Sequence, residues 1–259
     1  MERRGIMQVK FCGLRTMADV EAANRVHPDM AGFVFAHGSS RRIDARTAAL
    51  LRSRLDPSIR AVGVFCDQDP AAIEELVKNG IIDMIQLHGS EPEEQVRRLK
   101  RKAPVIRAFR IRSPKDLQMA RNTCASLVLL DAGAGEGVTF DWSLIRDFGR
   151  PYLLAGGLCP DNVQEAAGLQ PWGLDVSSGI ETRGTKDPAK MEAFLNAVRQ
   201  AETARPAKLI RQGSRSGWLQ FLVRAAAQSQ EDPDAGRSRQ GSGSIVEESR
   251  QTGKGGKRQ

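Results

Sequence analysis

The segment LVLLDA, residues 127–132, decides the fold class of this chain. Its four leading apolar residues follow one another without the polar alternation of a strand that faces water on one side. Strands buried on both faces have this composition, and they are typical of parallel sheets covered by helices. The apolar run ends at Asp131, so the same segment also places a titratable group at the end of a predicted strand.

Seven more strand candidates recur at regular intervals, and most of the eight are continuously apolar rather than alternating. Together with the first they predict strands at residues 8–12, 31–36, 61–66, 83–88, 105–111, 127–132, 152–157 and 174–179. Helical patterns between them lie at residues 44–55, 69–80, 90–102, 159–168 and 186–201, with a shorter one at 140–149. A strand–helix alternation repeated eight times predicts an α/β protein whose parallel strands close into a (β/α)8 TIM barrel.

The alternation stops near Ala204, where the composition changes. We therefore expect a barrel domain over residues 1–204 and a low-complexity tail over residues 205–259. The tail is rich in Gly, Ser, Gln and Arg and poor in apolar residues, so it is predicted to be disordered outside a helical pattern at 216–228. Of the net charge of +8, residues 206–259 carry +5, because ten Lys and Arg face five Asp and Glu there.

Charge and composition argue against several kinds of partner. The barrel segment is nearly neutral, and the basic tail has only Trp218 and Phe221 as stacking residues, so no nucleic-acid partner is expected. No apolar run approaches the roughly 18 residues of a membrane span. The N-terminal segment MERRGIMQVK lacks the apolar stretch of a secretory signal, and the four cysteines form no zinc pattern. We expect a cytoplasmic protein with reduced thiols and no metal site.

Residues with reactive side chains gather at one end of the predicted barrel. In barrels of this kind the active site lies at the carboxyl ends of the strands. A cysteine at a strand end often contributes only to packing, and an aspartate there often only caps a loop. The candidates all lie at the same end of the predicted barrel, however, and this shared position favours a functional site. The candidates at this end are Cys12, the segment 37–42 with Arg41, His88, Asp131, Gly156, Gly157 and Ser177–Gly179.

Two of these loops are suited to a phosphate group. AGGLCPDN, residues 155–162, follows the seventh predicted strand, and VSSGIETRGTKD, residues 176–187, spans the end of the eighth. A phosphate needs backbone N–H groups that can come close, which small residues allow. The loops after strands seven and eight of TIM barrels often bind phosphate, so we expect a small phosphorylated substrate.

The chain resembles a known family through seven motifs in order. These are VKFCGLRT (9–16), GFVFAHGSSRRI (32–43), VGVF (62–65), IQLHG (85–89), LLDAGAGEGVTFDW (129–142), LLAGGLCPDNV (153–163) and LDVSSGIETRGTKD (174–187). They look like the successive motifs of phosphoribosylanthranilate isomerase and cover roughly residues 8–200. The resemblance implies an enzyme of tryptophan biosynthesis that needs no cofactor. It would convert N-(5-phosphoribosyl)anthranilate to 1-(2-carboxyphenylamino)-1-deoxyribulose 5-phosphate by an Amadori rearrangement.

The resemblance also assigns catalytic roles. Opening the ribose ring needs an acid, and removal of the C2′ proton needs a base; the resemblance makes Asp131 the acid and Cys12 the base. Because the thiolate is the competent form, we expect the site to lower the pKa of Cys12 or to desolvate it only slightly. Asp131 should instead hold a proton near neutral pH, which burial would favour.

Further residues are assigned to the substrate in the same way. By resemblance, Arg41 contacts the anthranilate carboxylate, for which a guanidinium is a natural partner. His88 and Asp175 match positions close to the substrate. The matches to the phosphate loops are Gly156, Gly157, Ser178 and Gly179. We expect a monomer or a homodimer.

The chain departs from the family pattern at two loops. His37 stands where the family usually has a proline. The loop after Asp131 reads GAGEG (133–137), shorter than the usual Gly-Gly-Thr-Gly run, and its Glu136 adds negative charge near an anionic substrate. This charge is expected to weaken binding if the side chain points inward.

Three other functions remain open on the sequence. Indoleglycerol-phosphate synthase uses lysines and glutamates at strand ends, but only Lys10 on the first strand fits that set. The histidine-pathway isomerases place an aspartate where Cys12 stands. The alternative of a different class is a catalytically silent phosphate-binding barrel whose basic tail binds RNA or a partner. An assay that mixes the purified protein with substrate and monitors anthranilate fluorescence distinguishes these functions.

Overall fold

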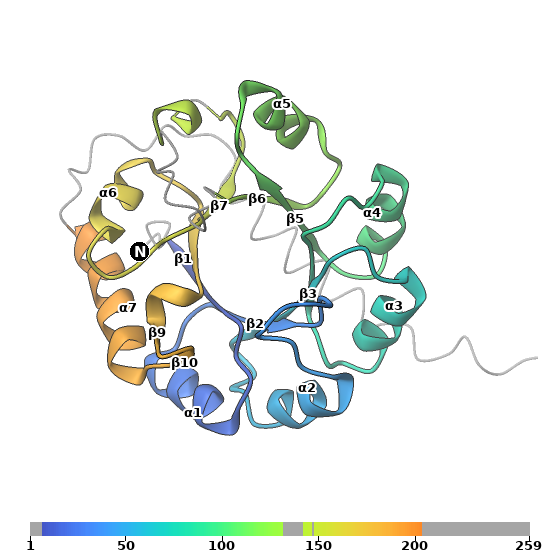
Figure 1. The fold of residues 1–259 in the computed structure, drawn as a ribbon, viewed down its shortest axis with the longest axis horizontal. Coiled ribbons are helices and arrows are strands. Elements are labelled where there is room, and N and C mark those ends of the chain that lie inside the picture. Colours follow the sequence, from blue (N-terminus) through green and yellow to red (C-terminus); the bar gives the residue numbers. More distant parts are fainter. Residues whose placement is uncertain (1–6, 132–141, 147, 204–259) are drawn as a thin grey trace, which may run out of the picture.

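A computed structural model describes residues 7–131, 142–146 and 148–203 of the chain. Eight parallel strands close into a barrel in sequence order, and helices surround them (Figure 1). The predicted TIM barrel is therefore confirmed. The strands are β1 (Gln8–Cys12), β2 (Met30–Val34), β3 (Arg60–Phe65), β4 (Met84–Leu87), β5 (Val105–Arg110), β6 (Leu127–Asp131), β7 (Tyr152–Ala155) and β8 (Gly173–Val176). The ring closes where β1 pairs with β8, which sets Lys10 beside Asp175.

The helices form the outer layer. They are α1 (Met17–Val26), α2 (Ala45–Arg52), α3 (Pro70–Lys78), α4 (Glu93–Lys100), α5 (Pro114–Asn122), α6 (Val163–Gly168) and α7 (Pro188–Thr203). Local sequence signals start them: Thr16 and Asp19 form a capping box at α1, and Asp69 precedes Pro70 at α3. After β8 the chain makes a short 3-10 helix, Ser178–Ile180, and a small hairpin of β9 (Glu181–Thr182) and β10 (Thr185–Lys186).

Two apolar layers hold the barrel. The larger one lies between the strands and the helices, and includes Phe11 and Phe194 in edge-to-face contact. Inside the barrel a second apolar layer consists of Met30, Val62, Met84, Ile106, Ala108, Leu127, Leu129, Leu153 and Ala155. Because these side chains fill the interior, the polar inward-facing residues are left for the carboxyl end of the strands.

Most expected elements differ in extent from the structure by a few residues, and three of these differences affect the segments around the site. The expected helix at 140–149 forms one 3-10 turn, Trp142–Ile145, within the part that the structure describes. The expected helix at 159–168 begins only at Val163, because Asn162 caps a preceding turn by accepting a hydrogen bond from the Cys159 N–H. The last strand ends at Val176 rather than 179, since the 3-10 helix follows it at once.

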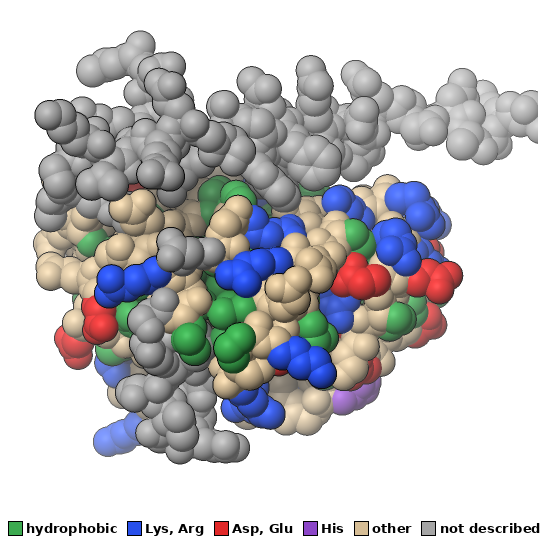
Figure 2. Space-filling model, turned by 90° about the horizontal axis from the view of Figure 1, so that it is seen from above, with side chains coloured by type: hydrophobic (Ala, Val, Ile, Leu, Met, Phe, Trp, Pro, Cys, Tyr) green, Lys and Arg blue, Asp and Glu red, His purple; other side chains and the backbone are tan. Residues whose placement is uncertain are grey.

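The tail that is predicted to be disordered, residues 205–259, lies outside the described residues, and the expected boundary at residue 204 lies at their edge. Both therefore stay predictions. None of the helices in residues 7–131, 142–146 and 148–203 is long and apolar enough to cross a membrane. Figure 2 shows one face of the molecule, on which Lys and Arg side chains are interspersed with Asp and Glu.

Candidate active site

A cavity of about 590 Å³ opens at the carboxyl ends of the strands. It receives all but one of the site residues that the sequence predicted; Gly179 does not line it. The lining residues among them are Cys12, Arg41, His88, Asp131, Gly156, Gly157, Asp175 and Ser178. His37, the departure from the family pattern, also lines the cavity, whereas Glu136 and the segment 133–137 lie outside the described residues.

Cys12 ends β1 on the inner face of the barrel and is only 8% exposed. Lys10, two residues earlier on the same face, is completely buried, and its Nζ lies 2.9 Å from the Asp175 Oδ1. The Ser177 hydroxyl donates to the backbone oxygen of Cys12 at 3.0 Å, which ties β1 to the loop after β8. The thiol therefore lines the cavity beside a buried ion pair and packs in a small apolar cluster with Val34 and Val64.

The expectation of a lowered thiol pKa is wrong. Burial raises the pKa of Cys12, because removal from water disfavours the thiolate. The Lys10 ammonium and, more weakly, Lys186 act in the opposite direction, while the Asp175 carboxylate adds to the rise. Desolvation dominates over these two cations, so the thiol form is favoured at this position.

Asp131 ends β6 and faces the same cavity. Its Oδ2 lies 3.5 Å from the His88 Nε2, and His88 follows β4, which β5 separates from β6. The Asp131 side chain keeps 24% of its surface exposed, so the burial that was expected to keep it protonated is incomplete. The contact instead gives Asp131 a neighbour that can exchange a proton or a hydrogen bond with it.

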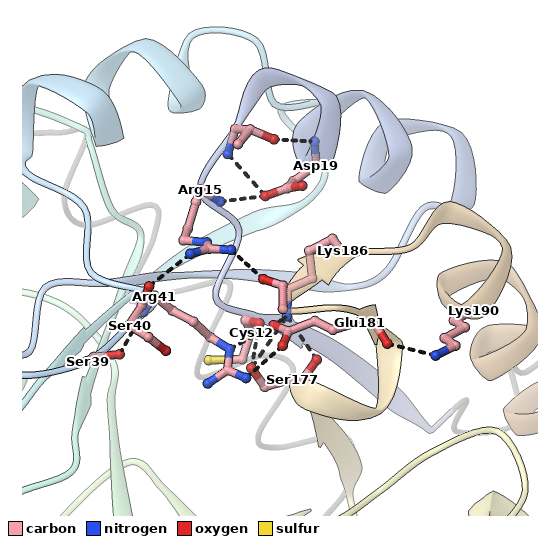
Figure 3. Close-up of polar contacts among 12 residues, drawn as sticks. Cys12, Arg15, Asp19, Ser39, Ser40, Arg41, Ser177, Glu181, Lys186 and Lys190 are labelled. Atoms are coloured by element: carbon pink, nitrogen blue, oxygen red, sulfur yellow. Dashed lines mark hydrogen bonds and ion pairs between the residues drawn. The ribbon is translucent and has the colours of Figure 1, made fainter.

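Arg41 is held by Glu181 in a bidentate ion pair (Figure 3). The Arg41 Nε and Nη2 donate to Oε1 and Oε2 of Glu181, each at 2.7 Å, and the Lys186 Nζ donates to the same carboxylate at 2.7 Å. Burial alone would raise the pKa of Glu181, but these two cations outweigh it and lower the pKa to about 2. Gly13, with a φ of 83°, leaves room for Arg41 to pass, since a Cβ there would lie 2.6 Å from the Arg41 Cδ.

The two glycine loops, which follow β7 and β8, come together at the mouth of the barrel. Gly156 and Gly157 have φ values of 96° and 63°, which few other residues adopt without strain. Gly179 packs against the first loop so closely that a Cβ would lie 1.8 Å from the Leu158 backbone oxygen. Gly179 is therefore required for the contact between the loops, while Gly156, Gly157 and Ser178 face the cavity.

Sequence reasoning missed several polar residues of this site. Ring closure positions Lys10, the small hairpin positions Glu181 and Lys186, and β4 and β5 carry Gln86 and Arg110. Glu181 and Lys186 belong to strands of two residues each, too short for any periodicity to reveal. The missed residues are Lys10, Gln86, Arg110, Glu181 and Lys186. Among the described residues, no group of three His, Cys, Asp or Glu side chains is arranged to hold a metal ion.

Comparison with known proteins leads to the same family that the sequence motifs resemble. A family model described as N-(5'phosphoribosyl)anthranilate (PRA) isomerase matches residues 9–197. The chain belongs to this family. A relative from Endomicrobium trichonymphae, named N-(5'-phosphoribosyl)anthranilate isomerase, is 43% identical over 200 residues, which cover 74% of this chain and 98% of the relative. The predictions of an isomerase and of tryptophan biosynthesis are confirmed by this membership.

Two solved isomerases of the family show the same fold. One, in complex with reduced 1-(O-carboxyphenylamino)-1-deoxyribulose 5-phosphate, is 34% identical with a TM-score of 0.69 and covers 75% of this chain and 100% of its own. The other, a monomeric form made from the dimeric phosphoribosylanthranilate isomerase of Thermotoga maritima, is 33% identical with a TM-score of 0.68 and covers 75% and 99%. In both cases the shared part is the barrel.

Proposed function

We propose that the protein converts N-(5'-phosphoribosyl)anthranilate to 1-(2-carboxyphenylamino)-1-deoxyribulose 5-phosphate, with Cys12 as general base and Asp131 as general acid. The observation that carries this proposal is that both side chains line one cavity, on strands β1 and β6, in a barrel of the isomerase family. A solved relative holds a reduced form of this product, which supports the choice of substrate.

The first step opens the sugar ring. Asp131 gives its proton to the ring oxygen as the C1′–O bond breaks, and the anilino nitrogen lone pair forms the C1′=N bond of an iminium ion. His88, 3.5 Å from the Asp131 carboxylate, is placed to hydrogen-bond the carboxylate that remains. This contact stabilises the negative charge that develops on Asp131.

The second step moves the double bond. The Cys12 thiolate takes the C2′ proton, and the C–H electron pair forms C1′=C2′ while the iminium electrons return to nitrogen. The neutral enolamine then tautomerises, since C1′ gains a proton and the C2′ hydroxyl becomes a ketone. No electrons leave the substrate, so the chemistry needs only an acid and a base.

Three groups of residues are proposed to bind the substrate. Arg41 faces the anthranilate carboxylate with the guanidinium nitrogen that Glu181 does not use, since Glu181 binds only Nε and Nη2. His88 and Asp175 contact the sugar portion. The phosphate is proposed to lie between the loops after β7 and β8, near Gly156, Gly157 and Ser178, with Gly179 holding the loops together.

The test of this function mixes the purified full-length protein with N-(5'-phosphoribosyl)anthranilate and monitors the loss of substrate fluorescence. The account expects saturable loss of substrate and no release of free anthranilate. A folded protein that leaves the substrate unchanged would instead support the silent barrel. Cytoplasmic location and a monomeric or homodimeric state stay predictions, which cell fractionation and sedimentation can check.

A further inference from the structure

Lys10 is a buried cation that the proposed reaction does not use. Its side chain is fully buried, and its Nζ makes a 2.9 Å hydrogen bond and ion pair with the Asp175 Oδ1. The two residues lie directly opposite each other where β1 pairs with β8. Buried ion pairs often add little to stability compared with apolar residues of similar volume, because both charges must leave water. The position of this pair beneath the cavity therefore points to an electrostatic role.

The ammonium group of Lys10 lies next to the Cys12 sulfur. The two residues are two positions apart on β1, so their side chains project from the same face of the strand. Gly32 on the neighbouring strand β2 leaves room for both. A Cβ at Gly32 would lie 3.0 Å from the Cys12 Sγ and 3.1 Å from the Lys10 Nζ. Both atoms thus pack against one backbone position, inside the barrel.

We propose that Lys10, fixed by Asp175, is a positioning residue whose ammonium charge stabilises the Cys12 thiolate. In a buried site of low dielectric, such a charge acts more strongly than it would in water. Burial raises the pKa of Cys12, and the Lys10 ammonium is the strongest influence that opposes this rise. The inference rests on the proposed function, because a stabilised thiolate matters only if Cys12 acts as a base.

Lys10 contributes its charge and transfers no proton. Burial lowers the pKa of Lys10, but Asp175 and Cys12 outweigh burial and raise it above the ordinary value, so the ammonium form persists. Other charged groups also face Cys12 from the elements packed around it. They are Asp175 from β8, Lys186 from β10, Arg41 from the loop after β2, and Glu181, which both of these cations share.

Asp175 and Lys10 should act on the thiol with opposite signs. Removal of the ammonium by Lys10→Met should raise the pKa of Cys12. Neutralisation of the carboxylate by Asp175→Asn should lower it, because the amide oxygen of Asn can still accept the hydrogen bond from the Lys10 Nζ. A loss of structure would move both variants in the same direction. The opposite signs therefore separate an electrostatic role of Lys10 from a purely structural one.

The experiment measures alkylation of the full-length protein by iodoacetamide from pH 6 to 10, with peptide mass spectrometry to follow Cys12. Cys66 is exposed and serves as an internal control in every sample. For Lys10→Met we expect the Cys12 midpoint to rise by about one pH unit, which slows alkylation near neutral pH about tenfold. For Asp175→Asn we expect a lower midpoint, and Lys10→Arg, which keeps the charge, should lie closer to the parent than Lys10→Met.

An unchanged or lower midpoint in a folded Lys10→Met protein, with normal Cys66 reactivity, would overturn the proposal. If Lys10→Met does not fold, Lys10→Gln decides, and an unchanged or lower Cys12 midpoint in that folded variant contradicts the inference. These outcomes are independent of catalysis. Full activity of Cys12→Ser would overturn the base role without altering the alkylation midpoints, so the two failures can be told apart.

Discussion

The guanidinium of Arg41 and the carboxylate of Glu181 are joined by two hydrogen bonds of 2.7 Å, from Nε to Oε1 and from Nη2 to Oε2. This pair connects the loop after β2 to the hairpin after β8, the two strands that flank β1. It fixes the plane of the guanidinium, and bidentate pairs of this kind are more specific in geometry than single contacts. Arg41 is thus oriented before any substrate arrives.

Replacement of Glu181 should weaken substrate binding. In Glu181→Gln, Arg41 keeps its charge but loses its charged partner, so its guanidinium is no longer fixed for the anthranilate carboxylate. We expect steady-state kinetics to show a KM raised about tenfold, with a smaller loss of kcat, because the proton transfers occur elsewhere. The exposed Glu192→Gln on α7 is a matched control. Equal KM values in the two variants would remove Glu181 from the account.

The same pair should make stability depend on pH in a defined window. The pKa of Glu181 falls from 4.5 to about 2 on folding, so its contribution is complete above about pH 4.5 and is lost as the pH falls towards 2. Thermal unfolding of the parent and of Glu181→Gln should therefore differ most above pH 5 and converge by about pH 2–3. A Tm difference that stays constant over this range contradicts the assignment.

Gly157 should control phosphate binding. Its φ of 63° is strained for a β-branched residue, and a side chain there would enter the cavity. We expect Gly157→Val to raise KM more than it lowers kcat, because the phosphate is remote from the reacting carbons, although remote binding energy can also orient the sugar. Inorganic phosphate should compete with substrate in the parent enzyme.

Gly80→Val is the matched control for that variant. Gly80 has a similar φ of 66° and open space around it, and it precedes β4 at the other end of the barrel. The control has comparable backbone strain without touching the cavity. Unchanged KM in Gly157→Val, with no inhibition by phosphate at tens of millimolar or so, would place the phosphate elsewhere.

Deletion of residues 206–259 should leave an active enzyme. The family match ends at residue 197, and α7 completes the ring of helices by Thr203. We expect the shortened chain to unfold at the same temperature as the parent and to retain its kcat/KM. Aggregation or loss of most activity would show that the tail contributes to the barrel, with residues 216–228 as the first segment to examine.

The sequence was sufficient to predict the barrel and the end at which the site lies. Continuous apolar runs such as residues 127–130 identify strands buried on both faces, and eight of them close a ring. The strand-end rule then brings Cys12, His88 and Asp131 to one cavity, as the structure has them. These predictions rest on local patterns of apolar residues, which can be recognised in a single sequence.

The electrostatic surroundings of Cys12 could not be predicted in the same way. Lys10 lies in an alternating strand and could have faced solvent; only the pairing of β1 with β8, far apart in sequence, sets it against Asp175. Glu181 depends likewise on a hairpin too short to leave a pattern. Burial of Cys12 is a property of the closed ring, which is why the expected lowering of its pKa was wrong.

The most direct test of the central claim is the turnover of Cys12→Ser and Asp131→Asn, measured by the fluorescence of N-(5'-phosphoribosyl)anthranilate. Cys66→Ser is the control, because Cys66 also lines the cavity but has no proposed role. The account predicts that kcat falls by roughly 10²–10⁴ in each of the first two variants and is near the parent value in the control. Near-normal turnover of either Cys12→Ser or Asp131→Asn would contradict the acid–base pair.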